Sequence, residues 1–316
     1  MAHDGGHISW YRREGDAGGT GERMPLILQD PTDAEKEEAE RLFLLSDRLT
    51  REGDAEEAFD ICREAAILGN ARAQAHLGIM YHFGDGTPAD ASCAFQWFRL
   101  SASHGDPHGQ FGLAACYRVG EGTAPDPVSA FSYYRAAALQ DLPEAFTHYG
   151  TCLQYGIGTA PDAQEAQVWY EKAIEHDVPG AKTLLATLYE ASGDRARVKQ
   201  AFLLYREEAA AGEKEARYRL GRMYFFGPDE YVQGKDRVLG VGFERDHRKA
   251  LECFKEVCAE SFEAVYLMGQ CYEMGLDGVE QDLKEARECY RAAASSGCAY
   301  AAEAQKWLDE HPEGDA

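Results

Sequence analysis

The sequence has no apolar run that approaches the roughly 20 residues a membrane-spanning helix needs. Its segment Met1 to Asp16 is rich in Gly, His and Asp and has no apolar core for export, so we expect the chain as given to be cytoplasmic. Basic residues are few, with 32 Lys and Arg against 55 Asp and Glu and a formal net charge of −23. Because such a surface repels nucleic acid and anionic membranes, we expect neither as a partner.

The nine cysteines include no Cys-x-x-Cys pair, and an odd number does not indicate a disulfide framework. Cysteine packs as a small apolar group, so we expect buried free thiols and neither zinc nor redox chemistry. His104 and His108 have the i, i+4 spacing of some metal sites, but Gly105 and Pro107 disrupt the helix that would align them. No Ser, His and Asp set can be proposed from spacing alone. We therefore expect no catalytic residues, no metal and no cofactor.

What the sequence does contain is a repeated alanine, followed four residues later by an aromatic residue or Cys. The repeated residues are Ala58, Ala94, Ala130, Ala166, Ala201, Ala250 and Ala286, and the steps between them are 36, 36, 36, 35, 49 and 36 residues. A period of this length is typical of a solenoid, in which each unit leaves an apolar face that only its neighbour covers. The period therefore predicts a binding surface rather than a central catalytic pocket.

Each repeat has the pattern of two antiparallel helices. Leu77, Gly78 and Tyr81 fall on one face of a first helix, and Gly84 and Gly86 end it. A small residue follows the repeated Leu position, where we expect the two helices to approach closely. An Asp four residues before the repeated Ala is expected to cap the second helix in every unit except that of Ala201, as follows: Asp54, Asp90, Asp126, Asp162, Asp246 and Asp282.

The pattern Leu-Gly-x-x-Tyr-x-x-Gly-x-Gly, followed by Asp-x-x-x-Ala-x-x-Trp-Tyr-x-x-Ala-Ala, resembles the Sel-one-like repeat (SLR) family, a relative of the tetratricopeptide repeat. The resemblance covers about residues 54–305. Its six copies have their Leu position at Leu77, Leu113, Tyr149, Leu185, Leu220 and Met268. It implies an all-α fold, an α/α solenoid with a right-handed superhelix, made of about six to seven helix-turn-helix repeats.

Two repeats depart from the pattern. The fourth has a short turn, Ser192-Gly193-Asp194-Arg195, which is closer to a tetratricopeptide turn. The fifth carries an insertion at residues 228–239. This insertion is either a specific functional element or a tolerated surface loop without a role, and the sequence leaves both readings open.

The ends of the chain differ from the repeats. Residues 1–30 combine many glycines and charges with few apolar residues, so we expect a flexible arm, in which Trp10 and Tyr11 either dock onto a groove or stay solvated. The expected boundaries are the arm at 1–30, the solenoid at 31–308 with a degenerate first unit at 32–69 and a C-terminal cap helix at 299–308, and a tail at 309–316.

In solenoids of helix pairs the first helices line the concave side. The residues that point there lie two before, two after and five after the Leu position, at i, i+4 and i+7, and we name these positions the first-helix stripe. Because aromatic residues and Arg are enriched at interface hot spots, the fifth and sixth repeats stand out. The candidate partner-binding residues are Tyr218, Arg222, Phe225, Tyr266, Gln270, Glu273, His82, Arg118 and Gln154. The alternative is that some of them pack between units.

These observations predict a non-enzymatic adaptor or scaffold that holds a peptide or protein segment on the concave face. One branch of the resembled family is cysteine-rich and secreted and has been associated with beta-lactam binding or hydrolysis, so a beta-lactamase-like enzyme is the alternative. That branch pairs its cysteines regularly within each repeat, whereas the cysteines here are irregular. A host-directed effector is a further alternative that the sequence does not separate from a housekeeping adaptor.

Overall fold

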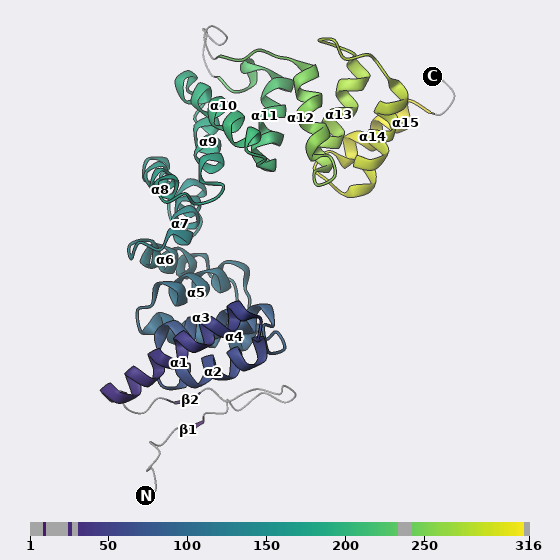
Figure 1. Cartoon of the computed structure of the whole chain (residues 1–316). Coiled ribbons are helices and arrows are strands. Elements are labelled where there is room, and N and C mark those ends of the chain that lie inside the picture. Colours follow the sequence, from purple (N-terminus) through teal and green to yellow (C-terminus); the bar gives the residue numbers. More distant parts are fainter. Residues whose placement is uncertain (1–8, 11–24, 27–30, 233–241, 313–316) are drawn as a thin grey trace, which may run out of the picture. The chain divides into compact units, whose positions relative to one another are not determined.

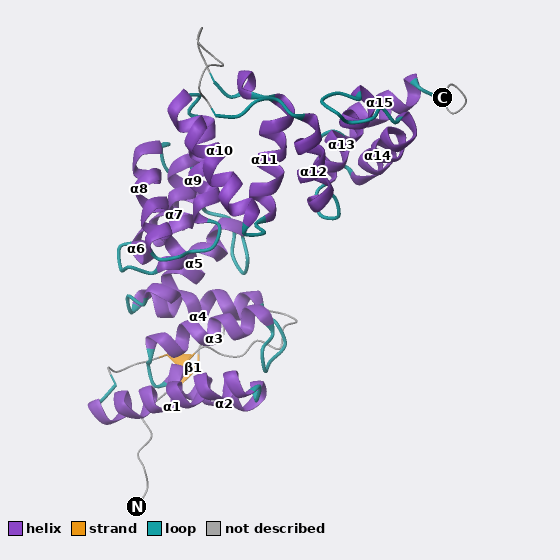
Figure 2. Cartoon of the chain, turned by 45° about the horizontal axis from the view of Figure 1, so that its top comes forward, coloured by secondary structure: helices purple, strands orange, loops and turns teal. Residues whose placement is uncertain are grey.

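The computed structural model describes residues 9–10, 25–26, 31–232 and 242–312. Contacts divide the chain into two compact units, Met1–His176 and Asp177–Ala316. The described residues form fifteen α-helices, one 3-10 turn and one antiparallel strand pair, β1 (Ser9–Trp10) with β2 (Pro25–Leu26) (Figures 1 and 2). The predictions for Tyr11, for the side chain of Trp10 and for most of the arm lie outside the described residues.

In the first unit, helices follow one another in pairs joined by short loops, and each pair packs on the next (Figure 1). Its helices are α1 (Asp33–Glu52), α2 (Ala55–Ile67), α3 (Ala71–Phe83), α4 (Ala91–Ser103), α5 (Pro107–Val119), α6 (Pro127–Ala138), α7 (Pro143–Tyr155) and α8 (Ala163–Glu175). The pair α1 and α2 precedes the repeats, which we number from α3–α4 as the first.

The second unit continues the same pattern. Its elements are α9 (Ala181–Ala191), α10 (Arg195–Ala210), α11 (Lys214–Phe226), the 3-10 turn η1 (Pro228–Glu230), α12 (His247–Val257), α13 (Phe262–Met274), α14 (Leu283–Ser296) and α15 (Ala301–Glu310). Helix α15 packs on α14. The predicted all-α fold made of helix pairs is thus confirmed. Within the described ranges, no helix combines the length and the apolar character needed to cross a bilayer.

The close approach within each helix pair is an aromatic ring of the second helix lying against the small residue of the first. A Cβ on Gly150 would lie 2.7 Å from Cε1 of Tyr170, and one on Gly269 would lie 2.9 Å from Cε1 of Tyr290. The rings of Phe98 and Phe254 meet their glycines in the same way, Gly78 at 2.7 Å and Gly221 at 2.6 Å. The second and fourth repeats accommodate an alanine there, Ala114 and Ala186.

The two glycines of each loop have separate roles. Gly84, Gly120 and Gly156 end their helices in the left-handed conformation, with φ of 80°, 81° and 69°. The second glycine approaches the repeat before it: a Cβ on Gly86 would lie 2.1 Å from the carbonyl oxygen of Ala55, the first residue of α2. Gly122 and Gly158 make the same approach to Ala91 and Pro127. The second glycine therefore sets the contact between successive repeats.

Aspartate caps fix the start of the second helices. The backbone N–H of Asp90 donates to the carbonyl of Tyr81 at 2.8 Å, while its carboxylate accepts from the N–H of Cys93. The fourth repeat also has such a cap, contrary to expectation: Asp194 accepts from two backbone N–H groups, three residues earlier than the repeat predicts, so α10 begins earlier and has 16 residues. Asp54 stands at the N-cap of α2 without a side-chain capping bond, which corrects the prediction for this residue.

A carboxylate replaces the loop glycine at the contact between the fifth and sixth repeats. Asp277, in the loop after α13, has φ of 54°. Its Oδ2 accepts from the backbone N–H of His247 at 3.2 Å and lies 2.6 Å from the Nδ1 of the same residue. His247 is the first residue of α12 and only 3% exposed. Hydrogen bonds from the side chain and backbone of His247 hold the pKa of the Asp277 carboxyl below its usual value.

We predict that Gly150→Leu destabilises the first unit by roughly 1 to 3 kcal/mol or more, because the added side chain must displace the buried Tyr170 ring. Ala163→Leu is the control, since Ala163 is exposed at the start of α8 in the same repeat, and it should change stability by less than about 0.5 kcal/mol. Urea unfolding followed by circular dichroism measures both. Equal stability of the two variants would contradict the packing argument.

We predict that Asp277→Asn lowers stability near neutral pH by at most about 1 kcal/mol, because its side chain is 45% exposed and solvent screens the pair. Asn tolerates the left-handed conformation, so mainly the charge changes. Since the folded-state pKa of Asp277 is lowered, its contribution is complete above the unfolded-state pKa and is lost as the pH falls through the folded-state pKa.

The difference in urea stability between wild type and Asp277→Asn should therefore be present at about pH 6 and shrink at about pH 3. Asp85→Asn, a change at an exposed loop carboxylate beside Gly84, serves as the control. A loss of the same size at both pH values would show that the charge of Asp277 is not responsible.

Candidate functional site

In five of the six repeats, the last position of the first-helix stripe, five residues after the Leu position, contacts the aromatic residue of its own second helix. Where that residue is tyrosine, the two side chains share a hydrogen bond. Arg118 Nε donates to the hydroxyl of Tyr134 at 3.3 Å, whereas the hydroxyls of Tyr170, Tyr205 and Tyr290 donate to Gln154 at 2.8 Å, Glu190 at 2.7 Å and Glu273 at 2.6 Å. All four rings are buried, so these polar groups satisfy hydroxyls that water cannot reach.

The two repeats with phenylalanine at this place behave differently. His82 turns to the next repeat, where its Nδ1 lies 2.7 Å from Oε1 of Glu121. Phe225 is 7% exposed and packs against Phe254 and against His247, at a ring distance of 5.2 Å. Phe225 therefore supports the helix pair from inside, which corrects its sequence interpretation as a surface contact.

Glu273 is occupied on both oxygens. Besides the Tyr290 hydroxyl on Oε2, it accepts the indole N–H of Trp307 on Oε1 at 2.8 Å. This bond ties the sixth repeat to α15. Its predicted role in binding a partner stays a prediction, but its carboxylate already has two donors within the chain.

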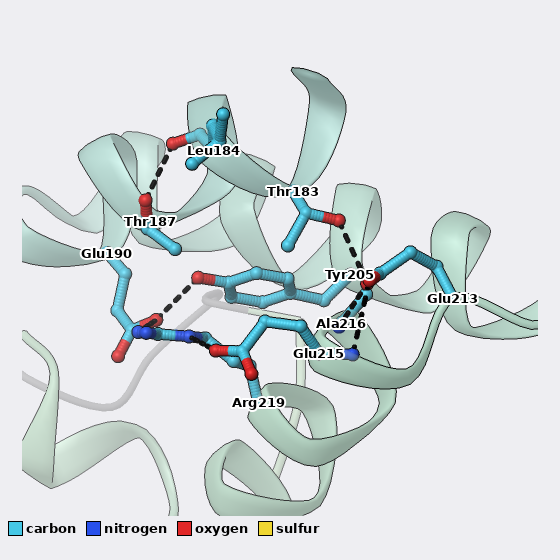
Figure 3. Close-up of polar contacts among 9 residues, drawn as sticks. All are labelled: Thr183, Leu184, Thr187, Glu190, Tyr205, Glu213, Glu215, Ala216 and Arg219. Carbon is cyan, nitrogen blue, oxygen red and sulfur yellow. Dashed lines mark hydrogen bonds and ion pairs between the residues drawn. The ribbon is translucent and has the colours of Figure 1, made fainter. Parts of the chain in front are cut away.

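A closed ionic cluster lies between α9, α10 and α11, and we name Tyr205, Glu190, Arg219 and Glu215 the Tyr205 cluster (Figure 3). Arg219 Nε donates to Glu215 at 2.7 Å, and its Nη1 lies 3.5 Å from Glu190 Oε2. Burial and the neighbouring Glu190 raise the pKa of Tyr205 far above its usual value, so the phenol stays protonated and donates. Each charge in this cluster has an internal partner, which is typical of a structural network.

Next to this cluster, Arg222 on α11 has no carboxylate partner among the described residues. Its guanidinium lies 5.9 Å from the ring centre of Tyr218 and 5.8 Å from that of Phe226. Its Nε is buried and makes no hydrogen bond with any described residue. Nearby, the hydroxyl of Tyr231 is also buried without a hydrogen-bond partner in the described structure. Sequence reasoning selected Arg222 but missed Tyr231, because the path of the insertion has no repeat to predict it.

Three half-buried tyrosines lie on the second unit: Tyr218 on α11, Tyr266 on α13 and Tyr300 at the start of α15. We name them the tyrosine row. The rings of Tyr266 and Tyr300 stack at 4.6 Å. Gln270 donates to the hydroxyl of Tyr266 at 3.3 Å. Burial raises the pKa of Tyr218 to about 12; Arg222 acts in the opposite direction, and Tyr300 is among the groups that raise it further. Of the predicted residues, the structure thus groups Tyr218 with Arg222, and Tyr266 with Gln270.

Burial makes several of the cysteines poor nucleophiles. All nine lie in the described ranges and form no disulfide, and five of them are buried. Burial raises the pKa of Cys62 and Cys271 to about 12 and that of Cys116, Cys253 and Cys289 to about 11. Because the thiolate is the reactive form, these thiols are inert near neutral pH.

The stacked helix pairs, glycine loops and capped second helices define a helical-repeat protein. The family model of the Sel1 repeat matches more than half of the chain, at residues 71–106, 107–142, 143–178, 214–260 and 262–298. The chain belongs to the Sel1 repeat family, and the resemblance found in the sequence is confirmed. The fourth repeat is not matched, in keeping with its short turn and shifted cap. Sel1 repeats generally serve as scaffolds for protein–protein interactions.

Two of the similar solved structures share about a quarter of the sequence. One is c5321 of uropathogenic Escherichia coli, described as a protective antigen that displays an SLR fold, with 26% identity over 88% of this chain and a TM-score of 0.65. The chain spans 58% of the length of that protein. The other is a Sel1 repeat protein from Oxalobacter formigenes, with 26% identity, a TM-score of 0.66 and coverage of 80% of this chain and 96% of that one. No curated protein matches the sequence.

We predict that Tyr205→Phe destabilises the second unit by about 1 to 3 kcal/mol, because it removes a hydrogen bond from Glu190, whose side chain is only 14% exposed. Tyr155→Phe is the control, since Tyr155 is 58% exposed, and it should be nearly neutral. Urea unfolding measures both variants. A change no larger than that of the control would mean that the hydroxyl contributes nothing to stability.

Proposed function

We propose that this protein is a non-enzymatic adaptor that binds a peptide or protein segment along α11 and α13, the first helices of the fifth and sixth repeats. The observation that carries the proposal is the half-buried tyrosine row beside Arg222, an arginine without an ionic partner among the described residues. Aromatic side chains and Arg dominate the binding energy of protein interfaces, and tyrosine offers a large contact area at a low cost in conformational entropy.

Two further observations support this choice of surface. The stripe residues Arg118 and Gln154 in the first unit already bond to buried tyrosines, so they have less to offer a partner. Tyr218 and Tyr266 keep part of their rings accessible. The family's general role as a scaffold agrees with a peptide or protein partner, and we propose that the partner is met in the cytoplasm.

A host-directed effector is the second candidate, favoured by the likeness to c5321, which is described as a protective antigen. An effector binds its partner through the same kind of surface, so the two candidates differ in the source of the partner. Capture from extracts of the source cells and from extracts of a host separates them.

We predict that Tyr218→Ala combined with Tyr266→Ala weakens partner binding by about tenfold or more, the effect expected when interface hot spots are truncated. Arg99→Ala combined with Val168→Ala is the control, since both residues are exposed on second helices. Wild type and both variants are used for affinity capture, and a captured partner is purified and titrated by calorimetry.

Melting curves are recorded for all three proteins, because Tyr266 also stacks on Tyr300, and titrations are run where all are folded. Loss of the partner by the tyrosine variant, with the control variant still binding it, supports binding along α11 and α13. Equal partner affinity of the tyrosine variant and wild type would overturn it.

A further inference from the structure

Two buried hydrogen-bond donors in the second unit have no acceptor among the described residues, and the charge of one residue, Arg222, acts on the other, Tyr231. They are Nε of Arg222 and the hydroxyl of Tyr231, and within the described residues these are the buried side-chain polar atoms that make no hydrogen bond. Leaving such a group without a partner costs about 1 to 3 kcal/mol, and more when it is charged. Unsatisfied buried polar groups are rare in folded proteins and indicate a missing acceptor.

The inserted segment of the fifth repeat supplies one of the two donors. The turn η1 packs against α11, and the residues after it, Tyr231 and Val232, are 8% and 5% exposed. The bond that joins the two helices does not depend on this segment, because the N–H of Asp246 donates to the carbonyl of Tyr224 at 2.8 Å, as Asp90 does to Tyr81 in the first repeat. The start of the insertion therefore adds the buried phenol of Tyr231, which the bond between Asp246 and Tyr224 does not require.

The carboxylates near Arg222 are paired with another arginine, so the charge of Arg222 is free to bind an anion. Arg219, one turn earlier on α11, is neutralised by Glu190 and Glu215. Arg222 has no such partner in the described structure, although the chain carries 55 acidic residues against 32 basic ones. The residue as a whole is half-buried, and its Nε is buried. The rings of Tyr218 and Phe226 make cation–π contacts with it, which do not neutralise the charge.

We propose that Arg222 and Tyr231 form a binding site for a carboxylate of a bound peptide, either an acidic side chain or the chain end. The proposal rests on the adaptor function proposed above and names the group that the partner contributes. A carboxylate matches the planar guanidinium, takes charge-assisted hydrogen bonds from it and accepts a further bond from a phenol.

A phosphate group fits the site less well. Arg222 is the only cation with a buried, unsatisfied donor among the described residues, and a phosphate group carries up to two charges. Glu190 also lies close enough to Tyr231 to act on it electrostatically, which disfavours a dianion at this place. A neutral amide, by contrast, would leave the guanidinium charge uncompensated.

Short peptides test the site directly on the full-length protein. The probes are N-acetyl-Ala-Phe with a free carboxylate, the same peptide as its amide, N-acetyl-Ala-Glu-Ala-amide, and inorganic phosphate. The readout is the NMR signal of the Arg222 Nε–H group, assigned by its disappearance in Arg222→Lys. We expect saturable shifts with at least one of the two carboxylate peptides and none with the amide or with phosphate. A response to only one of the two shows whether a chain end or a side chain is bound.

Conservative variants identify the donors. Tyr231→Phe and Arg222→Lys should each lower the affinity for the peptide that binds by about tenfold or more, as expected when one hydrogen bond to a charged group is lost. The controls Tyr155→Phe and Arg99→Lys, both at exposed positions, should leave the affinity unchanged. The affinities of the variants are measured from changes in the NMR signals of the peptide. This measurement also works for Arg222→Lys, which lacks the Arg222 signal.

Three results would overturn the site: an equal response to the amide, a response to phosphate in place of the carboxylates, or no response to any carboxylate peptide up to about 20 mM. Unchanged affinity in Tyr231→Phe would exclude the insertion from it. The adaptor proposal is tested separately, by the partner affinity of the variant with Tyr218→Ala and Tyr266→Ala. A partner that requires these tyrosines but is unaffected by Arg222→Lys would leave the adaptor standing and remove the carboxylate site.

Discussion

The contact between the aromatic ring of each second helix and the small residue of the first helix sets the spacing of the helix pair. At Gly150 the ring of Tyr170 occupies the volume of a side chain, so the helix backbone and the ring touch directly. A ring held this way is buried and cannot rotate outward, which fixes the position of its hydroxyl. Every polar feature of the first helices near that hydroxyl then has to match it, because a buried phenol needs a partner.

The need for a hydrogen-bond partner explains which residues occupy the position five places after the Leu position. Arg118, Gln154 and Glu190 differ in charge, yet each meets a tyrosine hydroxyl. Where the second helix carries phenylalanine, the same position is either apolar, as in Phe225, or directed to the next repeat, as in His82. The variation along the stripe therefore reflects internal hydrogen bonding as much as recognition of a partner.

The period of alanine and aspartate predicted the helix pairs, because each repeat must present the same shape to its neighbour. The same reasoning was less successful for the stripe, since helical periodicity gives the direction in which Phe225 or Glu273 leaves the backbone but not what meets it. The Tyr or Phe four residues after the repeated Ala was visible in the sequence and could have shown which stripe residues are occupied. Tyr231 had no such signal, because an insertion follows no period.

The insertion is consequently the part of the chain where structure adds most to sequence. In the loops of the first three repeats the second glycine packs on the preceding second helix, which leaves that position without a side chain. In the fifth repeat the backbone bond of Asp246 is kept, so this bond does not depend on the insertion. The hydroxyl of Tyr231 and the Nε of Arg222 are buried without an acceptor in the described structure, and each costs free energy that a ligand would recover. The energetic cost of these two donors is therefore the physical argument for placing function at the fifth repeat.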